Sequence, residues 1–322
     1  MRSARHIAIL MSLLAAFVTV LPTAATYAQD SAEIPPLPRP RPDRDAATTP
    51  AATPAEPTAA TDAIAALTDV PQPVTLTARI TQDGSTIPEG VVWRIFDDEP
   101  DATGEMALIA KADAGTAALE LAPGSYVVHA AYGRAQVSEP LSVVPGPNTH
   151  DVVLDAGALR LNSAVTGDIP ISPALLHFDI YTAGPEADRA LVADSLPPNE
   201  IVTLNAGTYH IVSRFGPINA VVRADLRVEA GQLTDATLYH HAAEVSFKLV
   251  SEEGGEAIAD VEWTVKTGDG ATIFAERGAF PSTVLSEGEY LVLAKLGDQV
   301  YNREIQVQPG SPREIEVLTT VY

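Results

Sequence analysis

Apolar and polar positions alternate with a period of two along most of the chain from residue 74 onward. Tyr126, Val128 and Ala130 form one set of alternate positions, and the same period follows Tyr209 and Tyr290. A period of two that is rich in β-branched residues is typical of strands with one face toward a core. The pattern therefore predicts β-structure throughout this part of the chain.

Glycine and proline divide the alternating segments into short strands. Within residues 74–157 the pattern predicts about seven strands, at 74–81, 90–97, 106–111, 116–121, 125–132, 135–144 and 148–154. Seven short strands in so few residues are typical of an antiparallel β-sandwich.

The same landmarks then occur three times. The segment LAPGSY at 121–126 recurs as LNAGTY at 204–209 and as LSEGEY at 285–290. An aromatic residue precedes each of these segments, and a further glycine follows each one; these residues are Trp93, Phe178 and Trp263, and Gly133, Gly216 and Gly297. Self-similarity at a fixed period is the signature of a repeat architecture. We therefore expect an all-β fold of three tandem seven-stranded antiparallel β-sandwich repeats, at 74–157, 158–243 and 244–322.

The recurring residues have predictable structural roles. The aromatic residues are expected to fill the space between the two sheets of each unit. The tyrosine that ends each LxxGxY segment is expected to bury its ring and to satisfy its hydroxyl near the strand corner. Glycine at the turns supplies a positive φ at low cost. Because the predicted strands leave gaps of only a few residues between units, the units are expected to stack with little freedom.

Two segments make a family resemblance specific. DGSTIPEGVVW at 83–93 and EGGEAIADVEW at 253–263 each precede an LxxGxY turn. With these turns, residues 74–322 resemble the carboxypeptidase-regulatory-like, transthyretin-like β-sandwich repeats of bacterial exported proteins, and more loosely immunoglobulin or fibronectin III modules. The resemblance implies spacer, adhesive or accessory roles, and it brings no catalytic residue. The unit at 158–243 departs most from the pattern, with Phe178 where the others have tryptophan.

The N-terminus has the features of a secretory signal peptide. Arg2 and Arg5 precede an uncharged run from Ile7 to Leu21, and Ala28 ends a small-residue cleavage site. The alternative is a membrane anchor, but the run is shorter than the roughly 20 residues a spanning helix needs. We predict a Sec-type signal peptide at 1–28 with cleavage after Ala28, and a periplasmic or secreted protein.

Residues 29–73 are predicted to be a disordered linker. They contain 10 prolines in 45 residues, together with alanine, threonine and charged residues. Such a segment has little apolar surface to bury against the entropy of ordering. The alternative is that the proline-rich run at 35–42 docks into an aromatic groove of a partner.

Charge and cysteine content exclude several classes of protein. The chain carries 42 acidic and 20 basic residues, a formal net charge of −22. This balance argues against nucleic acid as a partner and disfavours docking on anionic lipid. The complete absence of cysteine excludes disulfides, thiol catalysis, iron–sulfur clusters and a lipoprotein anchor. An exported, cysteine-free chain fits a bacterial periplasm or exterior.

No motif assigns catalytic chemistry, and we predict no catalytic, cofactor-binding or metal-binding residues. The sequence has no GxSxG elbow, no phosphate-binding P-loop and no HExxH pair. His129 and His210 are expected to face solvent. His240 and His241 would share a metal only if the chain kinked there, because neighbouring strand residues point to opposite faces.

The acidic segment Asp97-Asp98-Glu99 with Asp101 leaves two interpretations open. Clustered carboxylates are calcium ligands, although the spacing fits no EF-hand loop. The other interpretation is a solvated acidic turn that protects a sheet edge.

These observations together predict a function without catalysis. We expect an exported envelope or extracellular scaffold or binding protein that is not an enzyme and uses no cofactor. Its expected partner is a protein or an envelope polysaccharide, with no nucleic acid and no stable membrane insertion after signal cleavage. The alternative is an accessory or carbohydrate-binding module of a secreted enzyme system. Aromatic residues are only 6% of the chain, which leaves few rings for a sugar-binding face.

Overall fold

A computed structural model describes residues 70–319 of the chain. The predicted signal peptide at 1–28, the proline-rich run at 35–42 and the linker up to residue 69 lie outside the described residues. The last residues of the predicted linker are ordered, because the first strand begins at Gln72. Among the described residues, no helix has the length and apolar character needed to cross a membrane.

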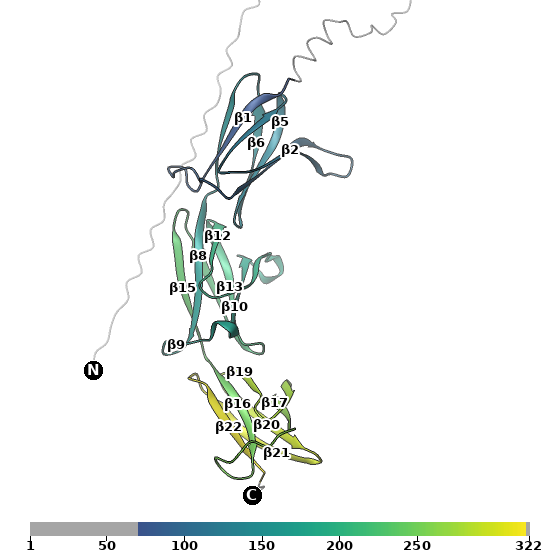
Figure 1. The fold of residues 1–322 in the computed structure, drawn as a ribbon, viewed down its shortest axis with the longest axis vertical. Coiled ribbons are helices and arrows are strands. Elements are labelled where there is room, and N and C mark those ends of the chain that lie inside the picture. The colour runs from purple at the N-terminus through teal and green to yellow at the C-terminus, as the bar shows by residue number, and fades with distance from the viewer. Residues whose placement is uncertain (1–69, 320–322) are drawn as a thin grey trace, which may run out of the picture. The chain divides into compact units, whose positions relative to one another are not determined.

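The described part is all-β, with 22 strands and two single-turn 3₁₀ helices (Figure 1). Sandwich 1 contains β1 (Gln72–Arg79), β2 (Val91–Pro100), β3 (Met106–Asp113), β4 (Thr116–Leu121), β5 (Gly124–Tyr132), β6 (Ala135–Val143) and β7 (Asn148–Val153). Sandwich 2 contains β8 (Ala156–Val165), β9 (Ile169–Pro170), η1 (Pro173–Leu175), β10 (Leu176–Thr182), η2 (Glu186–Asp188), β11 (Leu191–Leu196), β12 (Ile201–Asn205), β13 (Gly207–Phe215), β14 (Ala220–Val228) and β15 (Leu233–His240). Sandwich 3 contains β16 (Ala242–Val250), β17 (Glu262–Thr267), β18 (Thr272–Arg277), β19 (Ser282–Ser286), β20 (Gly288–Leu296), β21 (Gln299–Val307) and β22 (Arg313–Leu318).

The sheets have the same strand order in each sandwich. Sandwich 1 has a small sheet β4-β1-β7 and a large sheet β3-β2-β5-β6. The corresponding orders are β12-β8-β15 with β11-β10-β13-β14, and β19-β16-β22 with β18-β17-β20-β21. Sandwich 2 adds the short strand β9, which pairs with β8. The predicted β-sandwich fold is therefore confirmed, and the seven strands expected within 74–157 are all present.

The prediction of purely antiparallel pairing is wrong for one strand pair in each sandwich. The first and last strands are parallel neighbours, as in the register Val74↔Asn148 of β1 and β7. The pairs β8–β15 and β16–β22 are parallel in the same way. Parallel neighbours need a long crossover connection, and the intervening strands, which include the whole large sheet, supply it.

The aromatic residues at the repeated position fill the cores, as predicted. Trp93 and Phe178 have no exposed surface, and Trp263 is 1% exposed. The indole N–H of Trp93 donates to the carbonyl of Ala114 (2.7 Å), and that of Trp263 donates to the carbonyl of Gly278 (2.9 Å). Each indole is thus buried with its polar atom satisfied.

The predicted hydroxyl bonds of the repeated tyrosines are also confirmed, while the side chain is buried at Tyr290 and half-buried at Tyr126 and Tyr209. The hydroxyls of Tyr126, Tyr209 and Tyr290 each donate to a carbonyl four residues earlier, at 2.9 Å in all three. This is the geometry of a tyrosine corner. The expected left-handed φ occurs at the glycines of the hairpin turns that follow β5, β13 and β20. The φ angle is 62° at Gly133, 69° at Gly216 and 59° at Gly297.

The chain passes between sandwiches almost without a linker. Two residues, Leu154 and Asp155, separate β7 from β8, and His241 alone separates β15 from β16. The new sandwiches thus begin at Ala156 and Ala242, two residues before the expected starts at 158 and 244. Asp155 has a left-handed φ of 47°, a conformation that aspartate tolerates better than most residues.

Candidate functional site

The acidic residues Asp97, Asp98 and Glu99 lie in the last part of β2, and the turn that follows β2 folds around the carboxylate of Asp101. One oxygen of Asp101 accepts hydrogen bonds from the backbone N–H of Thr103 (2.8 Å), the hydroxyl of Thr103 (2.6 Å) and the N–H of Glu105 (3.0 Å). The Thr103 hydroxyl and these N–H groups lower the pKa of Asp101. This carboxylate therefore stabilises its own turn. Over residues 70–319, no three histidine or acidic side chains lie close enough to hold a metal ion.

The two neighbouring histidines lie in different surroundings. His240 is 1% exposed, and its Nε2 lies 2.8 Å from the hydroxyl of Ser213, which is 2.9 Å from the hydroxyl of Ser163. His241 is exposed and pairs with Glu287. Burial lowers the pKa of His240 to about 4. The arrangement is a buried polar network in the core of sandwich 2.

His129 and His210 have different degrees of exposure. His129 is half-buried on the outer face of its sheet, beside the hydroxyl of Ser138 (2.9 Å). His210 is only 8% exposed and its Nδ1 lies 2.7 Å from Asp225. The expectation that His210 faces solvent is therefore wrong. Its strand position does point away from the core, but the connection between β10 and β11 covers that face.

Sandwiches 1 and 2 meet through a set of hydrogen bonds that we call the first junction. The β5–β6 hairpin turn lies against β12: the N–H of Arg134 donates to the carbonyl of Thr203 (3.0 Å). The side chain of Asn205 joins both sides, accepting from the N–H of Gln136 (3.0 Å) and donating to the carbonyl of Leu154 (2.8 Å). The junction thus depends on specific polar contacts as well as on the short linker.

Sandwiches 2 and 3 meet in the same way at what we call the second junction. Asn219, in the β13–β14 turn, accepts from the N–H of Ser286 (3.0 Å) and donates to the hydroxyl of Tyr290 (2.8 Å). A small apolar cluster crosses this junction and consists of Val165, Phe215, Ala220, Ala242 and Val284. The second junction therefore combines a core with hydrogen bonds to the tyrosine corner.

The glycine of each of these hairpin turns shows how closely the turn approaches the next sandwich. A Cβ at Gly133 would lie 3.0 Å from the Cβ of Thr203, and a Cβ at Gly216 would lie 2.7 Å from the Cβ of Val284. A Cβ at Gly297, in the corresponding turn of sandwich 3, would meet nothing within 4 Å. The first two turns are contact surfaces, and the third is open.

Sandwich 1 differs from the other two at the surface that, in sandwiches 2 and 3, contacts the hairpin turn of the preceding sandwich. The residues that occupy the contact position in the following sandwiches are Thr203 and Val284, and the equivalent residue in sandwich 1 is Glu120, which is exposed. In the later sandwiches, the N–H groups of Ala206 and Glu287 donate to the connecting segment at 2.7 and 2.8 Å. The equivalent residue in sandwich 1 is Pro123, which has no N–H to donate.

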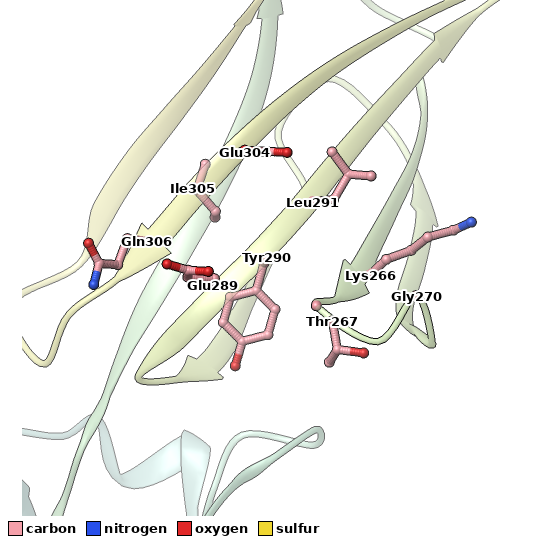
Figure 2. A pocket seen from close by; sticks show the side chains of 10 residues that line it. Lys266, Thr267, Gly270, Glu289, Tyr290, Leu291, Glu304, Ile305 and Gln306 are labelled. Atoms are coloured by element: carbon pink, nitrogen blue, oxygen red, sulfur yellow. The ribbon is translucent and has the colours of Figure 1, made fainter.

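A hollow of about 530 Å³ opens at the end of the large sheet of sandwich 3 (Figure 2). Lys266, Glu289 and Glu304 supply its charged groups, and Leu291 and the ring of Tyr290 supply apolar surface. These residues belong to β17, β20 and β21, and Figure 2 shows that their side chains do not converge on one point. The mixture of one cation and two carboxylates gives no catalytic constellation.

A second hollow, of about 290 Å³, lies on the outer face of the large sheet of sandwich 2. Three arginines contribute to its lining, and the other contributors are two aromatic side chains, one aliphatic side chain and one carboxylate. The lining residues are Arg189, Arg214, Arg223, Tyr181, His210, Val212 and Glu186. We call it the arginine hollow. No motif in the sequence predicts this hollow, and the one signal for it is the 183–190 connection, which is longer than the corresponding connections at 101–105 and 268–271.

Comparison with known proteins gives one family match. The sequence model of the Rhizobiales growth-associated tandem repeat domain matches residues 244–319, which is sandwich 3. No curated protein matches the chain in sequence. The family that matches differs from the carboxypeptidase-regulatory-like repeats that the motifs resemble, so that resemblance stays a prediction.

Several solved structures of bacterial proteins have some likeness to the chain. They include the Bacillus anthracis TIE protein, at 13% identity and a TM-score of 0.22, with 77% of this chain and 50% of that chain covered. GBS52, the minor pilin of Streptococcus agalactiae, has 14% identity and a TM-score of 0.31, with 52% and 95% covered. BcpA, the major pilin subunit of Bacillus cereus, has 11% identity and a TM-score of 0.23, with 78% and 100% covered. The chain spans half the length of the first, and at these scores none of the three bears on function.

Proposed function

We propose that the protein is an exported, non-catalytic scaffold whose three tandem sandwiches are held in a fixed relation by their junctions. The observation that carries the proposal is the repetition of one junction design. In both junctions a glycine-led hairpin turn contacts the next sandwich, and an asparagine side chain bonds across, from the receiving sandwich at Asn205 and from the turn at Asn219. Repeat proteins gain stability from such nearest-neighbour interfaces.

Three further observations support this role over catalysis or sugar binding. The sequence at 1–28 predicts export. The match of residues 244–319 to a domain described as a tandem repeat fits a chain built of repeated units. The two tryptophans are buried, so neither indole is available to stack on a sugar ring. A protein or an envelope polysaccharide is the proposed partner.

A matched pair of glycine substitutions tests the junctions. Gly216→Ala and Gly297→Ala both place a Cβ at a left-handed φ, which costs about 1–2 kcal/mol in each case. Only Gly216→Ala also forces a Cβ to within 2.7 Å of Val284 across the second junction. The two variants therefore share the local cost and differ only in the contact between sandwiches.

The absence of cysteine makes a distance measurement simple. Thr237 and Gln299 are exposed on sandwiches 2 and 3. Cysteines introduced at these two positions accept spin labels, and the distance between the labels is measured by pulsed electron–electron double resonance. We expect a narrow distance distribution in the parent and in Gly297→Ala, and a clearly broader one in Gly216→Ala. A broad distribution in the parent, or equal widths in the two variants, would contradict fixed junctions.

A further inference from the structure

The outer face of the large sheet in sandwich 2 is covered, unlike the outer face of an ordinary sandwich. Residues 183–190, which include η2, connect β10 to β11, and Glu186 and Arg189 from this connection line the same hollow as His210 and Val212 of β13. The loop therefore lies over the sheet, and Figure 1 shows its coiled ribbon beside β10 and β13. Val212 is only 5% exposed although it alternates with the core residue Ile211.

Two guanidinium groups of the arginine hollow are held in place by hydrogen bonds from their Nε atoms. The Nε of Arg214 donates to the carboxylate of Asp179 at 3.0 Å, and the Nε of Arg189 donates to the carbonyl of Gly184 at 3.0 Å. Their terminal nitrogens make no hydrogen bond to the described residues. Arg223 is exposed and forms no ion pair within residues 70–319. Arg189 and Arg214 thus present pre-oriented donors, which lowers the entropic cost of binding.

Of the three arginines, Arg214 is paired with the carboxylate of Asp179, whereas Arg189 and Arg223 form no ion pair within residues 70–319. Asp179 already accepts from Arg214 and from the N–H of Ser195 (3.0 Å), and Asp225 pairs with His210. Glu186 lines the hollow but lies more than 4 Å from every guanidinium of the described part, since it forms no ion pair there. Cationic donors therefore remain unsatisfied inside a protein whose net charge is −22.

We infer that the arginine hollow binds a small ligand through an oxyanion group, a carboxylate or a phosphate. Guanidinium groups match the geometry of both anions and form charge-assisted, bidentate hydrogen bonds with them. The ring of Tyr181 and the side chain of Val212 supply apolar surface for the part of the ligand that carries the anion. This inference is independent of the proposed scaffold role.

The donor set occurs in sandwich 2 alone. Strand register places Ser138 and Asn302 at the positions equivalent to Arg223 in sandwiches 1 and 3. Ala131 and Lys295 take the place of Arg214. The loop that covers the sheet is likewise replaced by an acidic hairpin in sandwich 1 and by a short turn in sandwich 3. The hollow is therefore no by-product of the shared fold.

A titration followed by NMR tests the inference on the mature chain. The probes are inorganic phosphate, D-glucuronate as the carboxylate, and D-glucose as a neutral control. We expect saturable shifts of the Val212 methyl groups with a Kd of about 1 mM. A response to phosphate alone assigns a phosphate ligand, and a response to glucuronate alone assigns a carboxylate ligand. Either outcome supports the site.

Two arginine variants separate the site from general charge effects. Arg223→Gln removes a lining donor and is expected to weaken binding at least about fivefold. Arg227→Gln removes the same charge from the same face of β14 but does not line the hollow; its side chain is 79% exposed. We expect this control to change the Kd by less than about twofold.

Three results would overturn the inference. The first is the absence of saturable shifts with both anions, and the second is an equal response to glucose. The third is an equal loss of affinity in Arg223→Gln and Arg227→Gln. Both substitutions are at exposed strand positions, so folding is not expected to obscure the comparison.

Discussion

Replacing Trp263 with alanine tests whether the repeated aromatic residue is a core residue. The indole is 1% exposed and stacks on Phe247, with ring centroids 5.6 Å apart. Removing such a side chain costs about 3–5 kcal/mol. The substitution also leaves the carbonyl of Gly278 without its indole donor. A small domain has only about 5–15 kcal/mol of stability in total, so sandwich 3 is expected to come close to unfolding.

Trp263→Phe is the matched control, because Phe178 occupies the equivalent position in sandwich 2 without exposed surface. This substitution keeps a ring between the sheets and removes the hydrogen bond to Gly278, which costs about 1 kcal/mol. We therefore expect a clear order of stability: parent, then Trp263→Phe, then Trp263→Ala.

Hydrogen exchange measured by mass spectrometry locates the effect. In Trp263→Ala, peptides from 242–318 are expected to lose protection while peptides from 72–153 keep it. In the parent, both tryptophans are expected to emit at short wavelength and to resist quenching by iodide. Unchanged protection in Trp263→Ala together with red-shifted, quenchable emission would refute a core role and favour an exposed ring that contacts a ligand.

Two further predictions concern the pH dependence of stability and the cleavage of the signal peptide. Because burial lowers the pKa of His240 from 6.5 to about 4, the unfolded chain binds a proton in this range while the folded chain does not. The free energy of unfolding is therefore expected to fall by roughly 3 kcal/mol as the pH drops through this range. His240→Leu, which introduces the residue type found at the equivalent Leu154, should flatten that pH dependence, and urea titrations at pH 7 and pH 4.5 measure it. Mass spectrometry of the native protein should find an N-terminus at Gln29, and an intact Met1 would contradict signal cleavage.

The local features of the fold could be predicted from the sequence because their causes lie within a few residues. Alternation around Tyr126 specifies a strand with one buried face, and the tyrosine hydroxyl bonds only four residues back, to Ala122. The burial of Trp93 and Trp263 follows from their place on such strands, since no other position protects so large an apolar ring. The recurrence of these features then specified the repeated sandwich.

The tertiary structure decided what depends on residues far apart in the chain. Parallel pairing of β1 with β7 joins Val74 to Asn148, and local periodicity does not distinguish parallel from antiparallel neighbours. The arginine hollow combines Arg189 from a loop with Arg214 and Arg223 from two strands. From the sequence, each of these arginines taken alone is expected to be a solvated surface charge. Alternation correctly placed His210 on the outer face of its strand, but only the packing of a separate loop over that face buried it.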